Sequence, residues 1–501
     1  MGIIIRQSIW ISASSYLGIL LGYVNVILLF PLFLEIDQIG SIRFIQSTSA
    51  LFLQFAQVGL SAVVLRYYPI ITQRVGNTSG FIPSALLASV FSFLVFLVAF
   101  TALEDQIWAY FSQNAPQTQD YAVLILVLIF LMSMQAVLEA YSRSILEAVV
   151  VNVLRDVVLR AVTTLLVAGY ALHWYDFMAF LWLFVGIYAL NLVLLTVYLG
   201  QRGHLRFSLD FRFWQQVNVR EMVSFSLFTF MGGSGSSIFR RVDAFMITSM
   251  LGLSATGIYT TMFNIAVVIE VPMAAIAQIS QPIIAKSFAA NDLETIAVIY
   301  RKSSINQQLI GSLLLVGIWA NLHNLFAIMP NGEEFSQGYW VVVLVGLAKL
   351  VDMSTGSNNE IINMSEHYRF NMLMMVLLAG VAVTTNWLLI PGLGMEGAAL
   401  ATLLTIVIFN MVKLIFIYWH YRIIPFTTKN GWLLVITAGV LYLALRVRPL
   451  GSVWLDLSLR SLGITLVFGV LVFLLRISED ANQLMLIVLR RIGLYNPKRS
   501  A

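Results

Sequence analysis

The sequence contains no cysteine among its 501 residues, and only 11% of its residues are charged. Without cysteine, disulfides, thiolate catalysis and cysteine-based metal sites are excluded. Soluble domains carry roughly 25% charged residues, so the low charge content excludes the soluble classes of protein. The histidines are scattered without metal-ligand spacing, and we therefore expect neither a metal site nor a cofactor. These histidines are His173, His204, His323, His367 and His420.

The chain is instead rich in apolar residues, which make up 59% of it and raise its mean hydropathy to +0.88. Apolar runs of about 20 residues, long enough to cross roughly 30 Å of hydrocarbon, recur from one end to the other. The formal net charge is +5, but the basic residues are spread through short loops. Such a spread is typical of the charge bias across a membrane, and we expect no nucleic-acid partner. The composition predicts an all-α integral membrane protein.

The apolar runs predict about fourteen transmembrane helices. The first run, from Ser8 to Phe33, is too long for the core of a signal peptide and lacks a small-residue cleavage site. We therefore interpret it as an uncleaved span. The predicted spans are 8–34, 41–65, 81–102, 121–142, 148–171, 177–199, 222–250, 256–284, 303–327, 338–364, 370–391, 396–419, 431–446 and 455–475.

The charges in the loops predict the orientation of these spans. If the amino terminus is cytoplasmic, the inner loops receive most of the arginines and lysines. The outer loops then receive acidic residues such as Glu104, Asp105, Glu333 and Glu334. Because basic residues are retained on the cytoplasmic side of membranes, we expect both termini in the cytoplasm.

A polar segment, residues 201–221, is interpreted as a basic cytoplasmic linker between two six-helix lobes at 1–200 and 222–421. Two additional helices at 422–476 and a cytoplasmic tail at 477–501 follow the second lobe. An internal repeat supports the division, because matching residues recur 217 or 219 positions apart. Duplicated halves around a central cavity are a common plan of secondary transporters. The matching pairs are Gly40 with Gly257, Glu147 with Glu366, and Asn191 with Asn410.

Two parts of the sequence carry a resemblance to a known family. The stretch from Arg241 to Tyr259 contains an aspartate, then a Leu-Gly pair, then a Gly-Ile-Tyr triplet, and residues 31–34, 39–40 and 57–60 form a similar first hairpin. These motifs resemble the polysaccharide-biosynthesis transporters of the multidrug/oligosaccharidyl-lipid/polysaccharide exporter superfamily. The resemblance covers nearly the whole chain and is closest to the Wzx-type flippases.

The resemblance implies a flippase that moves undecaprenyl-diphosphate-linked oligosaccharide across the bacterial cytoplasmic (inner) membrane by alternating access. Its product would serve O-antigen, capsule or exopolysaccharide assembly. The implied partners are the lipid-linked oligosaccharide, membrane lipids, protons or sodium ions, and a polysaccharide polymerase. The alternatives are a cation-coupled multidrug or metabolite exporter of the same superfamily and a lipid II flippase. The lipid II flippase pattern has several arginines in the first two spans, where this chain has only Arg6, Arg43 and Arg66.

Charged side chains at bilayer depth cost ~2.5–3.5 kcal/mol each on insertion scales and are therefore informative about function. Arg240 and Arg241 lie late in the seventh span, after a glycine- and serine-rich run that favours a kink or close packing. Guanidinium groups bind phosphate bidentately, so we expect a cationic cavity for the diphosphate of the substrate. Its members are predicted to be Arg240, Arg241, Arg155 and Arg43. Alternatively, Arg240 and Arg241 pair with Asp243, and Arg155 snorkels to the interface.

Other intramembrane charges are expected to neutralise one another. Asp156 and Arg160 form an i, i+4 pair in the fifth span, and Lys349 and Asp352 form an i, i+3 pair in the tenth. Lys413 is expected to snorkel to the interface.

Glu270 differs from these residues, because it lies near mid-membrane in the eighth span with no cation at i±3 or i±4. Such a carboxylate is suited to proton coupling, whether it is neutral or paired with a charge from a neighbouring helix. We therefore consider Glu270 and Asp243 as coupling groups. The alternative role of Glu270 is a structural ion pair with Arg240 or Arg241. We expect no enzymatic activity, because the sequence has neither an Asp-X-Asp motif nor a large outer loop.

Overall fold

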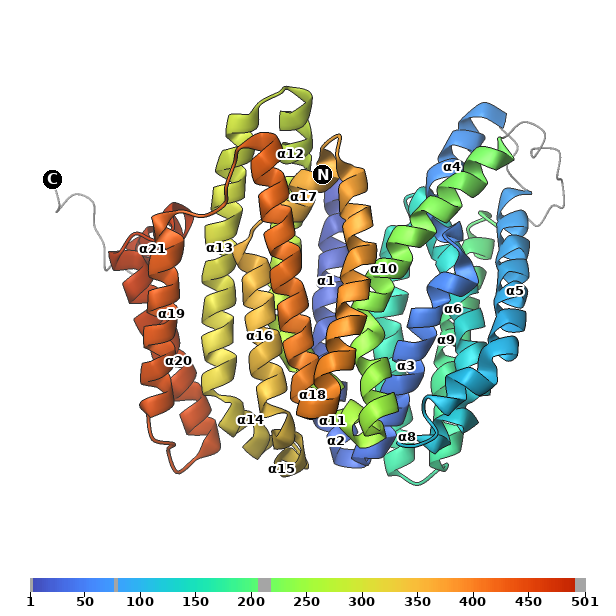
Figure 1. Cartoon of the computed structure of the whole chain (residues 1–501), viewed down its shortest axis with the longest axis horizontal. Helices are drawn as coiled ribbons and strands as arrows, with labels where there is room; N and C mark the ends of the chain where they lie inside the picture. The colour runs from blue at the N-terminus through green and yellow to red at the C-terminus, as the bar shows by residue number, and fades with distance from the viewer. Residues whose placement is uncertain (1–2, 76–79, 206–217, 492–501) are drawn as a thin grey trace. The chain divides into compact units, whose positions relative to one another are not determined.

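The computed structural model describes residues 3–75, 80–205 and 218–491, and all regular secondary structure in these ranges is helical (Figure 1). The predicted all-α class is therefore confirmed. The chain forms two compact units. The N-terminal unit comprises Met1–Thr260 and Met375–Val383, and the C-terminal unit comprises Thr261–Met374 and Thr384–Ala501.

The N-terminal unit contains the helices up to α10. They are α1 (Ile3–Tyr23), the π-helix η1 (Val24–Leu29), α2 (Phe30–Phe33), α3 (Ile36–Gln57), α4 (Leu60–Val75), α5 (Phe81–Ala109), the 3₁₀-helix η2 (Pro116–Tyr121), α6 (Ala122–Ser144), α7 (Ala148–Asn152), the π-helix η3 (Val153–Val158), α8 (Leu159–Ala171), α9 (Phe177–Gln201) and α10 (Val219–Leu251). Helix α11 (Leu253–Val267) begins in this unit and ends in the next.

The C-terminal unit contains the remaining helices, except for the part of α18 that belongs to the N-terminal unit. They are the 3₁₀-helix η5 (Val268–Glu270), α12 (Val271–Ala289), α13 (Leu293–Ala320), α14 (Leu322–Ile328), α15 (Gly332–Phe335), the 3₁₀-helix η6 (Ser336–Gly338), α16 (Tyr339–Ser354), α17 (Asn358–Met364), α18 (Tyr368–Tyr421), α19 (Thr428–Arg446), α20 (Val453–Leu474) and α21 (Glu479–Arg491).

Ten helices in the described ranges are long and apolar enough to cross a membrane, or up to twelve if each of two bent pairs is one span. The chain is therefore a multi-pass membrane protein. The predicted number of fourteen spans differs from this count at two places along the chain. The predicted span 148–171 is divided among α7, η3 and α8, and the predicted spans 370–391 and 396–419 are joined in α18, which kinks at Gly394 (φ 60°, ψ −138°). The count of fourteen stays a prediction.

Helix α10 contains the glycine- and serine-rich run of residues 232–237 without any break. Of the two predicted alternatives, a kink or close packing, the contacts of this run support close packing. Ser237 Oγ donates to the carbonyl of Ala50 in α3 at 3.0 Å, and a Cβ on Gly235 would lie 2.6 Å from the carbonyl oxygen of Met375. Because of this packing, α10 belongs to the N-terminal unit, whereas the sequence predicted a lobe that ends at residue 200. Of the predicted linker, residues 206–217 lie outside the described part of the chain.

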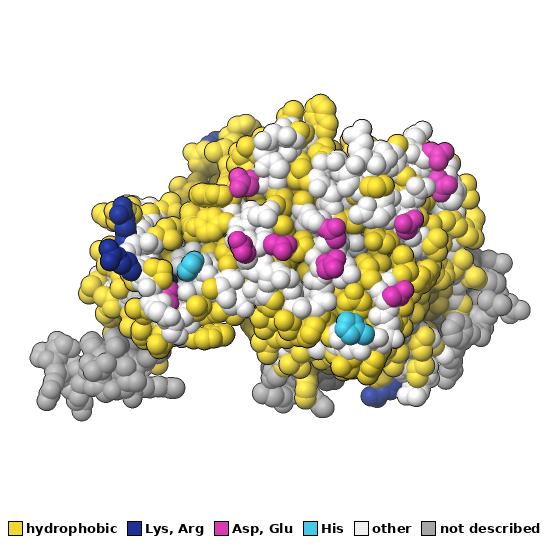
Figure 2. Space-filling view, turned by 90° about the horizontal axis from the view of Figure 1, so that it is seen from below, with side chains coloured by type: hydrophobic (Ala, Val, Ile, Leu, Met, Phe, Trp, Pro, Cys, Tyr) yellow, Lys and Arg dark blue, Asp and Glu magenta, His cyan; other side chains and the backbone are white. Residues whose placement is uncertain are grey.

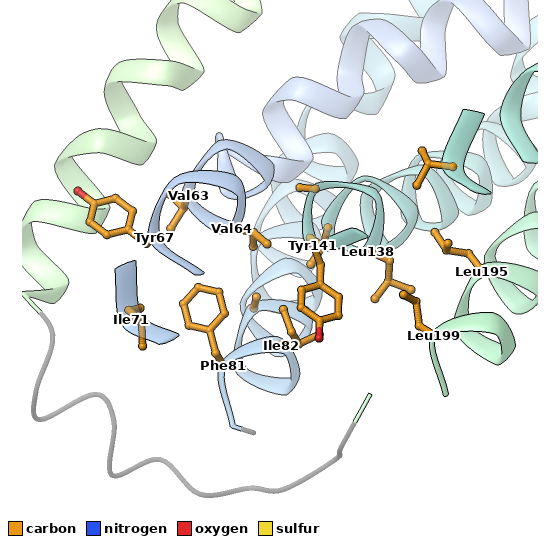
Figure 3. Packing of buried hydrophobic residues seen from close by; sticks show 14 of the residues in the cluster. Val63, Val64, Tyr67, Ile71, Phe81, Ile82, Leu138, Tyr141, Leu195 and Leu199 are labelled. Carbon is orange, nitrogen blue, oxygen red and sulfur yellow. The ribbon is translucent and has the colours of Figure 1, made fainter. Parts of the chain in front are cut away.

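Apolar side chains of α4, α5, α6 and α9 form a core in the N-terminal unit (Figure 3). Two hydrogen bonds fix the chain around this core. The hydroxyl of Tyr141 in α6 donates to the carbonyl of His204 after α9 at 2.7 Å, and Tyr67 in α4 donates to Glu221 Oε1 in α10 at 3.0 Å. The labelled core residues are Val63, Val64, Tyr67, Ile71, Phe81, Ile82, Leu138, Tyr141, Leu195 and Leu199.

The two additional helices predicted at 422–476 correspond to α19 and α20, which pack against α13 within the C-terminal unit. Leu433 and Ile436 of α19 and Phe468 of α20 meet Val316 of α13 in this core. Within the predicted cytoplasmic tail at 477–501, residues 479–491 form α21. Ser478 stabilises the start of this helix by accepting a hydrogen bond from the Ala481 amide at 3.2 Å.

Large apolar side chains remain exposed on the protein surface, as a bilayer solvent requires. Leu165 and Trp419 are each 70% exposed, and Leu474 is 67% exposed. Figure 2 shows hydrophobic side chains over much of one face, with Asp and Glu side chains among them. Exposed apolar surface on this scale marks contact with lipid.

Candidate functional site

Helix α3 carries Arg43, one of the predicted substrate-binding cations. A capping box starts this helix, in which the Glu35 amide donates to Gln38 Oε1 at 3.1 Å. The half-buried guanidinium of Arg43 lies 5.5 Å from the centre of the Phe30 ring and donates from Nη1 to Gln46 Oε1 at 3.1 Å. Its Nε and Nη2 are buried without a hydrogen-bond partner. These two buried nitrogens are therefore available to donate to an acceptor.

Tyr188 of α9 links Arg43 to Arg241 of α10. Gln46 Nε2 donates to the Tyr188 oxygen at 3.4 Å, and Tyr188 interacts electrostatically with both guanidinium groups. The side chain of Arg241 is half-buried and forms no hydrogen bond or ion pair with another described residue. The structure thus brings together two of the predicted cations, both in the N-terminal unit. We call Arg43, Gln46, Tyr188 and Arg241 the arginine cluster.

Sequence reasoning missed Gln46 and Tyr188. The available signal was the presence of polar side chains inside the apolar spans 41–65 and 177–199, since polar groups at bilayer depth need partners. What the sequence does not contain is the side-by-side placement of α3, α9 and α10, which depends on tertiary packing.

The other two predicted cations, Arg240 and Arg155, are placed differently. Arg240 is exposed next to Arg241. The side chain of Arg155 is 48% exposed, and its hydrogen bonds go to residues within three positions along the chain. It donates from Nε to Asp156 Oδ1 at 3.3 Å and from Nη2 to Asn152 Oδ1 at 3.2 Å. The bonds of Arg155 therefore do not reach the arginine cluster.

The predicted pair of Asp156 with Arg160 forms no ion pair in the part of the chain that the structure describes, although the two charges interact electrostatically. Asp156 lies in the π-helix η3 and Arg160 in α8. Asp156 instead pairs with Arg155, and its Oδ2 accepts a hydrogen bond from Ser15 Oγ of α1 at 2.9 Å.

Asp243 of α10 is 8% exposed and accepts a hydrogen bond from the Tyr259 hydroxyl of α11 at 2.8 Å. The aspartate and the tyrosine of the motif that carried the family resemblance are therefore in direct contact. This bond joins two helices across the turn at Gly252, and it explains why the motif needs both residues.

Glu270 has a cationic partner that the sequence did not predict. Lys349 Nζ of α16 lies 2.6 Å from Glu270 Oε2, and both side chains are largely buried in the C-terminal unit. The expected partners, Arg240 or Arg241, are replaced by this lysine. The predicted pair of Lys349 with Asp352 is wrong, because Lys349 faces η5 while Asp352 Oδ1 accepts a hydrogen bond from Asn410 Nδ2 of α18 at 2.9 Å.

Lys413 of α18 does not snorkel, contrary to the sequence-based expectation. Its side chain is completely buried, and Nζ donates to Asn359 Oδ1 of α17 at 2.7 Å. Its polar surroundings allow it to remain inside the protein. Among the described residues, no three His, Cys, Asp or Glu side chains come together as a metal ion would require.

Solved structures similar to this chain are membrane transporters. A structure described as the lipid II flippase MurJ in an inward closed conformation is 13% identical, with a TM-score of 0.70, and the match covers 94% of this chain and 100% of that one. An inward-facing multidrug resistance MATE family transporter of the MOP superfamily is 13% identical, with a TM-score of 0.60, and the match covers 77% of this chain and 93% of that one. At these identities the likeness shows the fold alone.

A MOP superfamily transporter from Pyrococcus furiosus, whose binding pocket is described as reversed in polarity, has a TM-score of 0.52 at 12% identity, over 83% of this chain and 91% of that one. No curated protein sequence matches this chain. Residues 4–288, more than half of the chain, match the family described as polysaccharide biosynthesis protein. The chain therefore belongs to this family of polysaccharide biosynthesis proteins, and it has the fold of the MOP superfamily transporters.

Proposed function

We propose that the protein is a flippase that moves undecaprenyl-diphosphate-linked oligosaccharide across the bacterial cytoplasmic membrane by alternating access. Both termini lie in the cytoplasm in this proposal. The translocated oligosaccharide supplies O-antigen, capsule or exopolysaccharide assembly. Family membership supports the polysaccharide part of the proposal, and the MOP-type fold supports transport.

The arginine cluster is the observation that carries the proposal. Arg43 holds two buried guanidinium nitrogens without an acceptor, and Arg241 has no described partner. Tyr188 contacts both electrostatically but is neutral, so it does not balance their charge. An anion with several oxygens would satisfy the donors of Arg43 and compensate both positive charges.

The choice of residue fits a phosphate ligand. All six lysines of the chain lie at position 286 or later, outside the N-terminal unit, so every fixed side-chain cation of that unit other than histidine is an arginine. The planar guanidinium fork matches phosphate geometry bidentately, whereas an ammonium acts as a point charge. A diphosphate that crosses the low-dielectric membrane needs such fixed cations, because an unpaired anion there is costly.

The neighbours agree with a lipid-linked diphosphate substrate. The MurJ structure, which carries the name of a lipid II flippase, matches almost the entire chain. MATE transporters match with lower TM-scores and over less of it. We therefore propose that the substrate is a lipid diphosphate, as the MurJ likeness suggests, and that its headgroup is an oligosaccharide, as the family description suggests.

The test is flipping of undecaprenyl-diphosphate oligosaccharide in proteoliposomes that contain matched amounts of each variant. Arg43→Gln and Arg241→Gln should each slow flipping by about 10- to 100-fold, the equivalent of ~1.5–3 kcal/mol for one charge-assisted hydrogen bond. Arg143→Gln is the control, because Arg143 is 42% exposed and pairs with Glu139 at 3.2 Å on α6. Wild-type protein that moves lipid II or a cationic drug but not the oligosaccharide lipid would contradict the proposal.

A further inference from the structure

Arg160 of α8 is a cation within a membrane span that does not belong to the arginine cluster. It lies two residues after the π-helix η3 and near the middle of the predicted span 148–171. Arg160 is half-buried, and its guanidinium group forms no hydrogen bond or ion pair with another described residue. Since a charged side chain at this depth is costly, a guanidinium group without such a partner marks a functional site.

The charges around Arg160 do not balance. Asp156 interacts with it electrostatically, but each oxygen of this carboxylate already accepts a hydrogen bond. Oδ1 accepts from Arg155 Nε at 3.3 Å, and Oδ2 accepts from Ser15 Oγ at 2.9 Å. Tyr23 also interacts with Arg160 electrostatically, but it is neutral. One carboxylate therefore faces two guanidinium groups, and a net positive charge remains.

Gly22 of α1 leaves room for the guanidinium group. A Cβ on Gly22 would lie 3.0 Å from Arg160 Nη1 and 3.2 Å from Cζ, so the guanidinium group lies directly against the backbone of α1. One turn earlier, a Cβ on Gly18 would lie 2.4 Å from the carbonyl oxygen of Asp156. This packing holds Arg160 at the level of Gly22, which lies near the middle of the predicted span 8–34.

Arg160 and Arg43 lie against the same side of the first membrane span. Arg43 lies against the ring of Phe30, which comes eight positions after Gly22. Two α-helical turns take about seven residues, and the π-helix η1 between Gly22 and Phe30 adds one residue to a turn. The two positions therefore come one above the other, about 12 Å apart along the span. The two guanidinium groups thus follow one side of the span at different depths.

We propose that Arg160 is a second anion-binding site, which takes a diphosphate group near the middle of the membrane, one step away from the arginine cluster. An anion that crosses roughly 30 Å of hydrocarbon needs compensating charge at more than one depth. The planar guanidinium fork of Arg160 matches phosphate oxygens, and its donors are available. The role of this site as a step in transport rests on the proposed function, whereas anion binding at Arg160 does not.

The first experiment measures the binding of inorganic pyrophosphate to the full chain in detergent by isothermal titration calorimetry. Wild type should bind at two sites, and Arg160→Gln should remove one of them while it keeps the site that Arg43→Gln removes. Arg143→Gln is the matched control, because Arg143 is 42% exposed and pairs with Glu139, and it should bind like wild type. Binding that Arg160→Gln leaves unchanged overturns the inference.

A second experiment returns the charge chemically, which is possible because the chain has no cysteine of its own. Arg160→Cys should lose the same pyrophosphate site. Reaction with 2-aminoethyl methanethiosulfonate adds an ammonium group and should restore part of the binding, whereas the neutral methyl methanethiosulfonate should not. A purely structural role of the side chain predicts no such dependence on charge. Restoration by both reagents, or by neither, overturns the inference.

The flipping assay separates this inference from the proposed function. Arg160→Gln should slow flipping of the oligosaccharide lipid by about 10- to 100-fold at matched incorporation, as expected for the loss of a charge-assisted hydrogen bond. If wild type binds pyrophosphate through Arg160 but does not move this lipid, the anion site stands and the proposed function fails. If Arg160→Gln flips the lipid at the wild-type rate, Arg160 does not lie on the transport path and the inference is overturned.

Discussion

Gly40 of α3 and Gly257 of α11 lie directly against each other, although 217 residues separate them. A Cβ on Gly257 would lie 2.5 Å from the carbonyl oxygen of Ile36 and 3.1 Å from the amide nitrogen of Gly40. A Cβ on Gly40 would lie 1.9 Å from the carbonyl oxygen of Leu253. Ile36 and Leu253 are themselves 217 positions apart, and each glycine meets the residue that lies four positions before the other glycine.

A hydrogen bond repeats the same relationship. Ser254 Oγ donates to the Asp37 carboxylate, and these residues also lie 217 positions apart. When two copies of a unit meet at a two-fold axis, the same positions of each copy form the contact, which is therefore self-complementary. The residues that the proposed repeat matches at this point of the sequence thus lie in contact.

The close approach predicts that Gly40→Ala is destabilising. The added methyl group would overlap a backbone carbonyl that cannot rotate away, and overpacking of this kind costs about 1–3 kcal/mol. Gly186→Ala on α9 is the control, because a Cβ there has no atom within 4 Å and the change should be neutral or stabilising. Thermal unfolding in detergent, followed by tryptophan fluorescence, measures both. Equal melting temperatures for the two variants would contradict the prediction.

Replacement of Arg241 by lysine separates a phosphate clamp from charge balance. Lysine keeps the charge but loses the bidentate fork, so Arg241→Lys should recover only part of the flipping that Arg241→Gln loses. If Arg241 only balances Asp243, the double variant Arg241→Gln with Asp243→Asn should flip at the wild-type rate. Flipping of the oligosaccharide lipid in proteoliposomes, at equal incorporation, decides between the two roles.

The ion pair of Glu270 with Lys349 allows the coupling role of Glu270 to be tested apart from stability. Glu270→Gln leaves a buried lysine without its carboxylate, so both transport and thermal stability should fall. The double variant Glu270→Gln with Lys349→Met removes both charges and should regain stability. If Glu270 takes part in coupling, transport stays impaired in the double variant. Wild-type transport there would make the pair structural.

Asp456 and Arg460 of α20 should be essential for the stability of the C-terminal helices. Arg460 donates from Nε to Asp456 Oδ2 and from Nη2 to Oδ1, both at 3.1 Å, and the two side chains are 7% and 2% exposed. Asp456 also accepts hydrogen bonds from Asn324 and the Leu450 amide. Asp456→Ala should destabilise the protein by ~3–5 kcal/mol, as expected for one partner of a buried pair. The melting temperature of Lys302→Ala, which breaks an exposed pair, provides the comparison.

The predicted orientation can be checked because the chain has no cysteine of its own. A cysteine at Ser208, in the linker outside the described residues, should react with an impermeant thiol reagent only after cell lysis. A cysteine at the exposed Glu333 should react in intact cells. The reverse pattern of labelling would place both termini outside.

The amino-acid sequence by itself determined the all-α membrane class, because apolar runs of membrane length leave helices as the structures that satisfy the backbone within lipid. It also determined the family, through the motif from Asp243 to Tyr259. These properties depend on local composition and short spacing. The sequence also predicted close packing as one of two roles for residues 232–237, and the contacts of α10 show such packing.

Only the tertiary structure decided which charged residues meet. The sequence paired Lys349 with Asp352 and left Glu270 alone, because it could judge neighbours only along one helix. The partner of Glu270 comes from α16 and that of Lys413 from α17, at separations of 79 and 54 residues. Similarly, the hydrogen bond from Ser15 of α1 to Asp156 joins residues 141 positions apart, and a pattern of charges within one helix could not show it. Local sequence patterns determine which charged residues lie within the membrane spans, whereas the contacts between helices determine the partners and therefore the role of each charge.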